Sequence, residues 1–280
     1  MGRHLNNNQF DQYYTSKKLA ARCINCITSN VEEEYRQFYL EPSAGNGSFL
    51  QGIVTNKYLA IDIDPKAENV IKTNFLLFRP PEEWNKKVTT VLGNPPFGHA
   101  GNLAIKFFNH ATSFANTICF ILPRSFKKIS IQNKLSLSYN LTFEEDIGNN
   151  GFVLISGCEY KTCSCVFQIW KSRENLPIRQ KIIYNDNPYL VFCNKIEAIA
   201  AIRRTGGRAG QLVPVENSAE SSTLFVKPQK DVSTEKMIEV IKLANLIETS
   251  DYTASVKAVS ASEIHQKLSN LASLSEKMTS

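Results

Sequence analysis

The residues with the clearest chemical potential form the hexapeptide Gly93-Asn-Pro-Pro-Phe-Gly98, which follows an apolar, β-like run. Pro95 and Pro96 lack backbone N–H donors and have a fixed φ, so the backbone here offers mainly carbonyl acceptors. The side-chain oxygen of Asn94 and the Pro95 carbonyl can both accept hydrogen bonds from a planar NH₂ group, while Phe97 can stack on the ring that carries it. The alternative is a proline-rich turn without a ligand.

A second segment, Glu41-Pro-Ser-Ala-Gly-Asn-Gly-Ser-Phe49, follows an earlier β-like run and contains two closely spaced glycines. Ligands bind at this position in open α/β sheets, at the carboxyl ends of the strands. A dinucleotide fingerprint would require a third glycine where this chain has Leu50, so NAD binding is disfavoured. The simplest alternative is a tight turn that binds nothing.

The next β-like run ends in Ile61-Asp-Ile-Asp-Pro65 and places a carboxylate at the tip of the adjacent strand. Asp62 can accept both hydroxyls of a ribose there, or it can cap a helix. Its position one βα unit after the glycine turn favours the ribose.

The elements that must position these residues alternate from Tyr35 onward, as in a sheet built from βαβ units. The expected strands and helices are strands 37–40, 58–61, 88–92 and 117–122, and helices 17–28, 47–54, 65–73 and 102–115. Two later β runs, 152–156 and 162–170, have no helical pattern between them and predict an antiparallel pair at a sheet edge. The sequence therefore predicts an α/β fold with a doubly wound, Rossmann-like sheet that ends in a C-terminal antiparallel hairpin near Trp170.

The alternation stops after Glu174, where a mixed region begins. It contains a basic, glycine-rich stretch at 203–210, a strand-like run at 223–226, and amphipathic helical patterns at 233–249 and 262–271. We therefore expect two domains, residues 1–171 with the three motifs and a small α+β domain at 172–280.

Composition restricts the class of protein. With 42% hydrophobic and 21% charged residues, the chain resembles neither disordered nor collagen-like sequences, and its longest apolar runs are too short to span a bilayer. The first residues lack an apolar signal region, and Asn6 replaces the Ser or Thr of a myristoylation signal. Seven cysteines, an odd number, favour reduced thiols and an intracellular location, cytoplasmic or nuclear. A net charge of +6 allows a polyanionic partner or an ordinary solvated surface.

In this order and spacing, E-P-S-A-G-N-G-S-F, I-D-I-D-P and N-P-P-F resemble the motifs of class I S-adenosylmethionine-dependent methyltransferases that modify the N6 amino group of adenine. The motif order resembles the gamma arrangement of amino-methyltransferases. The resemblance covers roughly residues 10–170, including Phe10-Asp-Gln-Tyr-Tyr14-Thr15 and Val166-Phe-Gln-Ile-Trp170. It implies that residues 1–171 form the catalytic domain and that 172–280 serves substrate recognition or an accessory role.

The resemblance also implies that S-adenosyl-L-methionine is the cofactor and that no metal is needed. The implied cofactor-binding residues are Tyr14, Thr15, Glu41, Pro42, Ala44, Gly45, Gly47, Asp62, Ile63, Asn74 and Phe75. The family usually presents an Asp-Phe pair to the cofactor adenine; the matching pair here is Asn74-Phe75, which brings no charge. Asn94, Pro95, Pro96 and Phe97 would be catalytic and orient the amine for direct methyl transfer.

The implied substrate is adenine in nucleic acid, with DNA favoured over RNA. A base inside a duplex must be flipped out, and related enzymes place an aromatic side chain against it, for which Phe97, Phe152 and Tyr160 are candidates, the last two also candidates for the core. The candidate phosphate contacts are Arg203, Arg204 and Arg208. Two other functions stay open: methylation of a glutamine side-chain amide in a protein, and a non-catalytic, nucleic-acid-binding subunit with this fold.

Overall fold

A computed structural model describes residues 13–53, 57–154, 156–160, 164–251 and 257–279. The chain divides into two compact units, Met1–Phe126 with Asn133–Gln180, and Lys127–Gln132 with Lys181–Ser280. Residues 172–180 thus belong to the first unit, and a short piece after residue 126 belongs to the second. Residues 10–12 of the amino-terminal motif and 162–163 of an expected strand lie outside the described residues.

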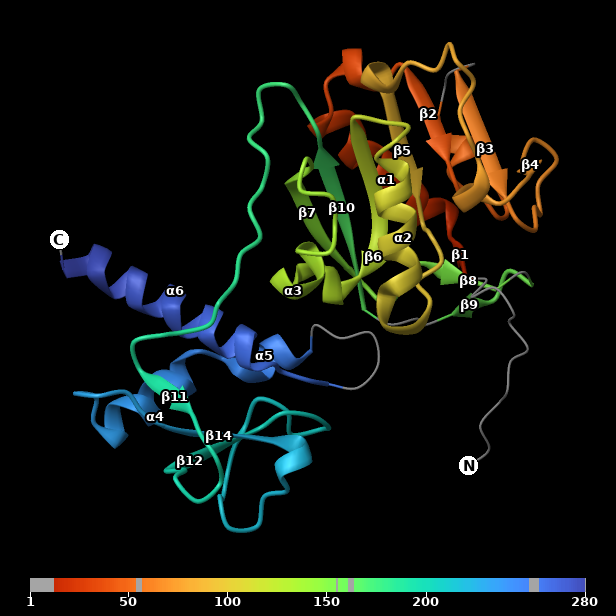
Figure 1. The fold of residues 1–280 in the computed structure, drawn as a ribbon. Helices are drawn as coiled ribbons and strands as arrows, with labels where there is room; N and C mark the ends of the chain where they lie inside the picture. The colour runs from red at the N-terminus through yellow and green to blue at the C-terminus, as the bar shows by residue number, and fades with distance from the viewer. Residues whose placement is uncertain (1–12, 54–56, 155, 161–163, 252–256, 280) are drawn as a thin grey trace. The chain divides into compact units, whose positions relative to one another are not determined.

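The first unit contains a seven-stranded sheet with the order β4-β3-β2-β5-β6-β10-β7 (Figure 1). Its strands are β2 (Phe38–Glu41), β3 (Tyr58–Asp62), β4 (Ile71–Lys72), β5 (Thr89–Gly93), β6 (Thr117–Pro123), β7 (Asn140–Gly148) and β10 (Cys165–Lys171). The five strands from β4 to β6 are parallel, whereas β10 is antiparallel to both β6 and β7. From β2 the chain winds outward to β3 and β4, then returns to β5 on the other side of β2. The sheet therefore has its topological switch point between β2 and β5.

Helices cover both faces of this sheet. The helix α1 (Lys17–Asn30) buries Cys23 and Ile27 in one core cluster with Ile169 of β10. The helix α2 (Asn102–Ala111) packs Phe108 edge-on against Trp170, with the ring centroids 5.4 Å apart. Because successive side chains of a strand point to opposite faces, α1 and α2 lie on opposite sides of the sheet. This arrangement confirms the predicted doubly wound, Rossmann-like α/β fold.

Two expected helices beside the glycine turn do not form. Turns and the short 3₁₀ helix η2 (Leu50–Gly52) replace the helix expected at 47–54, and the segment 65–73 contains bends and the two-residue strand β4. Gly52 lies directly against Ile24 of α1, and a Cβ atom there would lie 2.4 Å from Ile24 Cδ1, so the Ile24 side chain would have to move. The close approach to α1 thus takes precedence over a regular helix, in which Gly is also unfavourable.

The predicted pairing of 152–156 with 162–170 at the sheet edge is wrong, because each segment pairs with a different strand. The strand β10 pairs with β7, whereas β8 (Phe152–Val153) joins β1 (Tyr14–Thr15) and β9 (Glu159–Tyr160) in a separate three-stranded sheet. As an edge strand, β7 carries consecutive acidic residues at 144–146 and lacks an apolar run. Its sequence therefore gave no strand signal.

The second unit contains a four-stranded antiparallel sheet with the order β11-β14-β12-β13. Its elements are α3 (Ile129–Gln132), β11 (Leu190–Phe192), β12 (Ala200–Arg203), β13 (Leu212–Val213), β14 (Thr223–Pro228), α4 (Thr234–Leu243), α5 (Leu246–Ser250) and α6 (Ala261–Thr279). A core cluster joins Ile202 and Val226 of the sheet to Met237 of α4 and Leu268 of α6. The helix expected at 233–249 is interrupted at Asn245, which has a φ of +46°. No helix in the described part of the chain is long and apolar enough to cross a membrane.

Candidate active site

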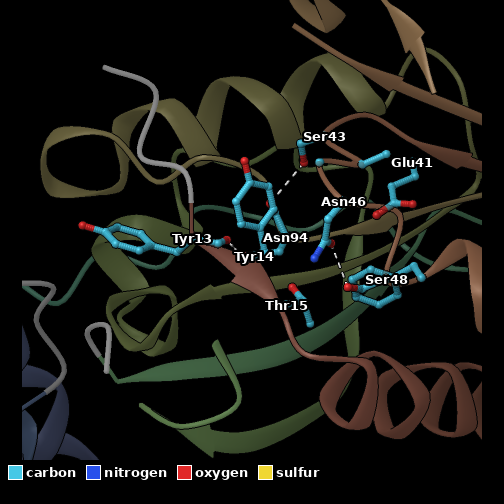
Figure 2. A pocket seen from close by; sticks show the side chains of 11 residues that line it. Tyr13, Tyr14, Thr15, Glu41, Ser43, Asn46, Ser48 and Asn94 are labelled. Carbon is cyan, nitrogen blue, oxygen red and sulfur yellow. Dashed lines mark hydrogen bonds between the residues drawn. The ribbon is translucent and has the colours of Figure 1, made fainter. Parts of the chain in front are cut away.

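A pocket opens at the carboxyl ends of β2 and β5, which is the topological switch point of the sheet (Figure 2). Three segments that are far apart in the sequence form it: β1 with the preceding residue, the loop after β2, and the first residue after β5. Its lining residues are Tyr13, Tyr14, Thr15, Glu41, Ser43, Ala44, Gly45, Asn46, Ser48, Phe49 and Asn94. The cavity volume is ≈ 30 Å³. A whole small-molecule ligand usually fills about 300–1,000 Å³, so the space suits only a small part of one.

The glycine turn brings backbone into close contact with an aromatic ring. Gly45 and Gly47 have φ values of +51° and +73°, a region that L side chains rarely adopt. A Cβ atom on Gly45 would lie 2.8 Å from the Tyr14 ring, so only glycine fits there. The Gly47 N–H donates to the Ala44 carbonyl at 2.8 Å and closes the turn.

Asp62 at the end of β3 links the neighbouring strand tip to this turn. Its carboxylate accepts hydrogen bonds from the Gly45 N–H at 2.8 Å and from the Asp64 N–H at 2.7 Å. Each carboxylate oxygen has a further lone pair, so Asp62 can still accept from ligand hydroxyls. The next residue, Ile63, is 47% exposed and is not among the pocket-lining residues.

Glu41 at the end of β2 is a buried acid that lines the pocket. Burial raises its pKa to about 8, the hydrogen bond from the Tyr58 hydroxyl opposes this shift, and the nearby charge of Asp62 adds to it. Glu41 is therefore mainly neutral at pH 7. A positively charged group in the pocket would favour its ionised form.

Asn94 is held at two points. Its Nδ2 donates to the Tyr13 carbonyl at 3.3 Å, and its backbone carbonyl accepts from the Ser43 hydroxyl at 3.1 Å (Figure 2). Because the Tyr13 carbonyl can only accept, this contact fixes which end of the amide is nitrogen. Oδ1 is left buried and has no hydrogen-bond partner among the described residues. Such an orphaned acceptor costs about 1–3 kcal/mol, so the site is suited to a ligand with an N–H donor.

The rest of the N-P-P-F motif and Tyr14 lie around this amide. Pro95 is buried, and Pro96 is half-buried. Phe97 is half-buried and packs against the core cluster that contains α1. The Tyr14 hydroxyl is also buried without a partner among the described residues, and burial raises its pKa.

Several residues that the sequence placed at the site lie elsewhere. Asn74 caps the 3₁₀ helix η3 (Phe75–Leu77), with Oδ1 accepting from the Leu76 N–H at 3.0 Å. Phe75 is buried against the Phe107 and Phe114 rings and does not line the pocket. The pocket lining also does not include Pro42, Gly47 or Asp62.

Of the two aromatic residues in the hairpin region that were proposed to contact substrate, Phe152 is not at the pocket. Phe152 is 1% exposed and belongs to the core cluster that contains α1. It is therefore a core residue, which was the alternative to substrate contact. The Tyr160 side chain lies outside the part of the structure that is described.

The proposed phosphate-binding arginines lie in the second unit, at the end of β12 and in the following loop. Arg203 Nε donates to the Thr205 carbonyl at 3.1 Å, whereas Arg204 and Arg208 are exposed. A Cβ atom on Gly206 or Gly207 would meet nothing within 4 Å, so both glycines face open space.

Sequence reasoning missed four pocket residues that contribute polar groups: Tyr13, Ser43, Asn46 and Ser48. The last three lie inside the glycine motif, so their hydroxyl and amide groups were a usable signal. Tyr13 contributes its backbone carbonyl to Asn94, and the type of a residue does not show what its backbone carbonyl binds.

Neither a protein-family model nor a curated protein matches the sequence. Similar solved structures include a Pyrococcus horikoshii protein named as an RNA methyltransferase (TM-score 0.45, 15% identity, covering 61% of this chain and 93% of that chain). Others are the 23S rRNA methyltransferase ErmE (0.39, 15%, 60% and 72%) and a Listeria monocytogenes protein named as a class I S-adenosylmethionine-dependent methyltransferase (0.43, 10%, 65% and 66%). At these values, the assignment of function depends on the geometry of the site.

Proposed function

We propose that this chain is an S-adenosyl-L-methionine-dependent methyltransferase that acts on the N6 amino group of adenine in nucleic acid, with DNA favoured over RNA. The observation that carries the proposal is the orphaned Oδ1 of Asn94, which is buried at the switch point beside a glycine turn. The three motifs that resemble adenine-N6 methyltransferases supply the choice of cofactor and base.

The residues around the pocket fit this cofactor. Gly45 and Gly47 keep the turn free of side chains, and Asp62 retains acceptor capacity for ribose hydroxyls. Glu41 is a buried acid that a cationic group would ionise, and Thr15 lines the same pocket. When bound, S-adenosyl-L-methionine supplies a methyl group on a positively charged sulfur. The sulfur is the leaving group and keeps the carbon–sulfur electron pair as the new bond from carbon to nitrogen forms.

Asn94 would act on the nitrogen that receives the methyl group. Its Oδ1 accepts one N–H of the target amine, so the lone pair points away from this oxygen and out of the plane of the base. Positive charge develops on the nitrogen during transfer, and the hydrogen bond to Oδ1 and one to the Pro95 carbonyl then become stronger. The surplus proton leaves to solvent. Catalysis of this kind depends on position and on preorganised dipoles.

The choice of nucleic acid as substrate is supported by the second unit. Arg204 and Arg208 expose their side chains around Gly206 and Gly207, which place no side chain of their own between these arginines and a phosphate. The preference for DNA rests on the resemblance of the motifs, because an adenine amino group looks the same on both polymers.

The test is transfer of labelled methyl from S-adenosyl-L-methionine into duplex DNA, single-stranded DNA, RNA and protein extract, followed by nucleoside and amino-acid analysis. We expect label in N6-methyladenine, with the rate reduced at least about 100-fold in Asn94→Ala. Asn194→Ala is the matched control, because Asn194 is exposed in the second unit and its side chain bonds to the nearby Glu197.

Other outcomes would refute the proposal in different ways. Label confined to glutamine would show that the Asn94 acceptor binds an amide NH₂ of a protein. Cofactor binding without transfer to any of the four substrates would favour a non-catalytic subunit. Protection against thermal unfolding measures cofactor binding, since a ligand at 100 times its Kd adds about 2.7 kcal/mol of stability.

A further inference from the structure

We propose that Ser43 is the positioning residue that orients Asn94 toward its target amine. The identity of the amine rests on the proposed function, whereas the contacts between Ser43, Asn94 and Tyr13 are independent of it. The Ser43 side chain lines the pocket and also bonds to the backbone of Asn94.

The argument begins with the backbone on either side of Asn94. Gly93 has a φ of +143°, and a Cβ atom there would lie 3.4 Å from Glu41 Cγ. Gly93 is the last residue of β5 and pairs with Phe120 of β6, so the chain is held up to this point. Pro95 fixes its own φ and restricts Asn94 to the extended region, where ψ still ranges over about 40°. Within that range, the orientation of the Asn94 carbonyl depends on an external contact.

Ser43 supplies this contact. Its hydroxyl donates to the Asn94 carbonyl at 3.1 Å from a loop 51 positions earlier in the sequence. This carbonyl is part of the peptide bond to Pro95, so the contact holds the Asn94–Pro95 peptide plane and limits ψ of Asn94.

The second anchor acts at the other end of the residue. Asn94 Nδ2 donates to the Tyr13 carbonyl, 81 positions earlier, at 3.3 Å. This side-chain hydrogen bond is near the upper limit of length and would not hold the amide alone. With the backbone fixed by Ser43, both anchors together leave only Oδ1 to face a ligand. A displacement of about 1 Å in such an arrangement can reduce a rate 100-fold.

The variants are Ser43→Ala, which removes the hydroxyl, and Ser43→Thr, which restores it. Ser138→Ala is the matched control, because Ser138 is on the surface of the first unit and its hydroxyl bonds to the nearby Ser136. The first measurement needs no cofactor or substrate. It is the hydrogen exchange of the Asn94 side-chain NH₂ in ¹⁵N-labelled protein, with the signal assigned by its loss in Asn94→Asp.

We expect exchange of this NH₂ to be at least about 10-fold faster in Ser43→Ala and near the wild-type rate in Ser43→Thr and Ser138→Ala. Calorimetric titration should give Kd values for S-adenosyl-L-methionine within about threefold of each other. The kcat of methyl transfer should fall about 10- to 100-fold in Ser43→Ala with little change in KM for the cofactor, and Ser43→Thr should recover most of it.

The outcomes separate this inference from the proposed function. Unchanged NH₂ exchange and unchanged kcat in Ser43→Ala would overturn the positioning role. A cofactor Kd that weakens in proportion to kcat would overturn it as well, since Ser43 would then be a binding residue. Faster NH₂ exchange in a protein whose wild type methylates no substrate would support the positioning of Asn94 and refute the methyltransferase.

Discussion

Glu41 makes the stability of the first unit depend on pH in an unusual direction. Its pKa is about 8 in the folded chain, against the ordinary value of 4.5 for a Glu carboxyl, which applies to the unfolded chain. Between these values the folded state holds a proton that the unfolded state has lost, so stability falls as pH rises. The stabilisation is fully present below pH 4.5 and is lost as pH rises through 8. Most buried carboxylates that form ion pairs behave in the opposite way.

The magnitude follows from the shift and from complete burial of the group. Each pKa unit corresponds to about 1.36 kcal/mol, so a shift from 4.5 to about 8 gives a contribution on the order of 5 kcal/mol over the whole range. The structure gives no residue that forms an ion pair with Glu41 among those described; its recorded partner is the neutral Tyr58 hydroxyl. Glu41→Gln keeps the shape of the side chain and cannot ionise, so this slope should disappear.

Urea unfolding followed by tryptophan fluorescence at pH 5, 6, 7 and 8 measures the effect. Both tryptophans, Trp84 and Trp170, lie in the first unit, so the signal reports on the unit that contains Glu41. The difference in unfolding free energy between Glu41→Gln and wild type should change by roughly 1 kcal/mol per pH unit in favour of the variant. Parallel curves for the two proteins would refute the neutral, buried acid and with it the expectation that a cationic ligand ionises Glu41.

Three further predictions concern other parts of the chain. Gly45→Ala should lower the thermal midpoint of the first unit by roughly 2–8 °C, since it requires a left-handed alanine against the Tyr14 ring; an unchanged midpoint would show that the turn tolerates a side chain. Lys128→Met should destabilise the second unit by about 3–5 kcal/mol in urea unfolding, because it leaves Glu263 buried without its ion-pair partner at 2.8 Å, and a loss below about 1 kcal/mol would contradict this. Arg204→Ala should reduce the slope of log affinity for duplex DNA against log salt by about 1, whereas an unchanged slope would place the phosphate contacts on other residues.

The central strands could be predicted from the sequence because they are buried on both faces. The strands β2, β3, β5 and β6 begin and end within about one residue of their expected positions, as continuous apolar runs allow. The edge strand β7 was not predicted because it is charged. The two helices that do not form were predicted wrongly because tertiary contacts override the local sequence pattern. The helix lost at Gly52 shows this effect, since the close packing against α1 has no trace in a local window.

The site was predictable where function depends on residue type. Asn94 and Gly45 were identified by the chemistry that an amide and a glycine turn can perform, and the structure brings both to one pocket. Phe75 was expected at a ligand but lies in an aromatic cluster, because a sequence shows that a ring is apolar and not which way it faces. The contact from Ser43 to Asn94 joins a hydroxyl to a backbone carbonyl across the sheet, and no spacing rule encodes it.

The unpaired Asn94 acceptor and the protonated Glu41 carboxyl restrict the ligands of the pocket more than its shape does. Among the described residues, the Asn94 Oδ1 has no donor, and Glu41 holds its proton, so both groups are satisfied best by a ligand that offers N–H groups and positive charge. A dinucleotide would bring a pyrophosphate toward the same turn, where it would meet the acids Glu41 and Asp62. A buried group in such an unfavourable state calls for an explanation, and a ligand that uses it is one. The electrostatics of the turn and the orphaned amide therefore favour the same pair of ligands, a cationic cofactor and an amine, and disfavour the anionic one.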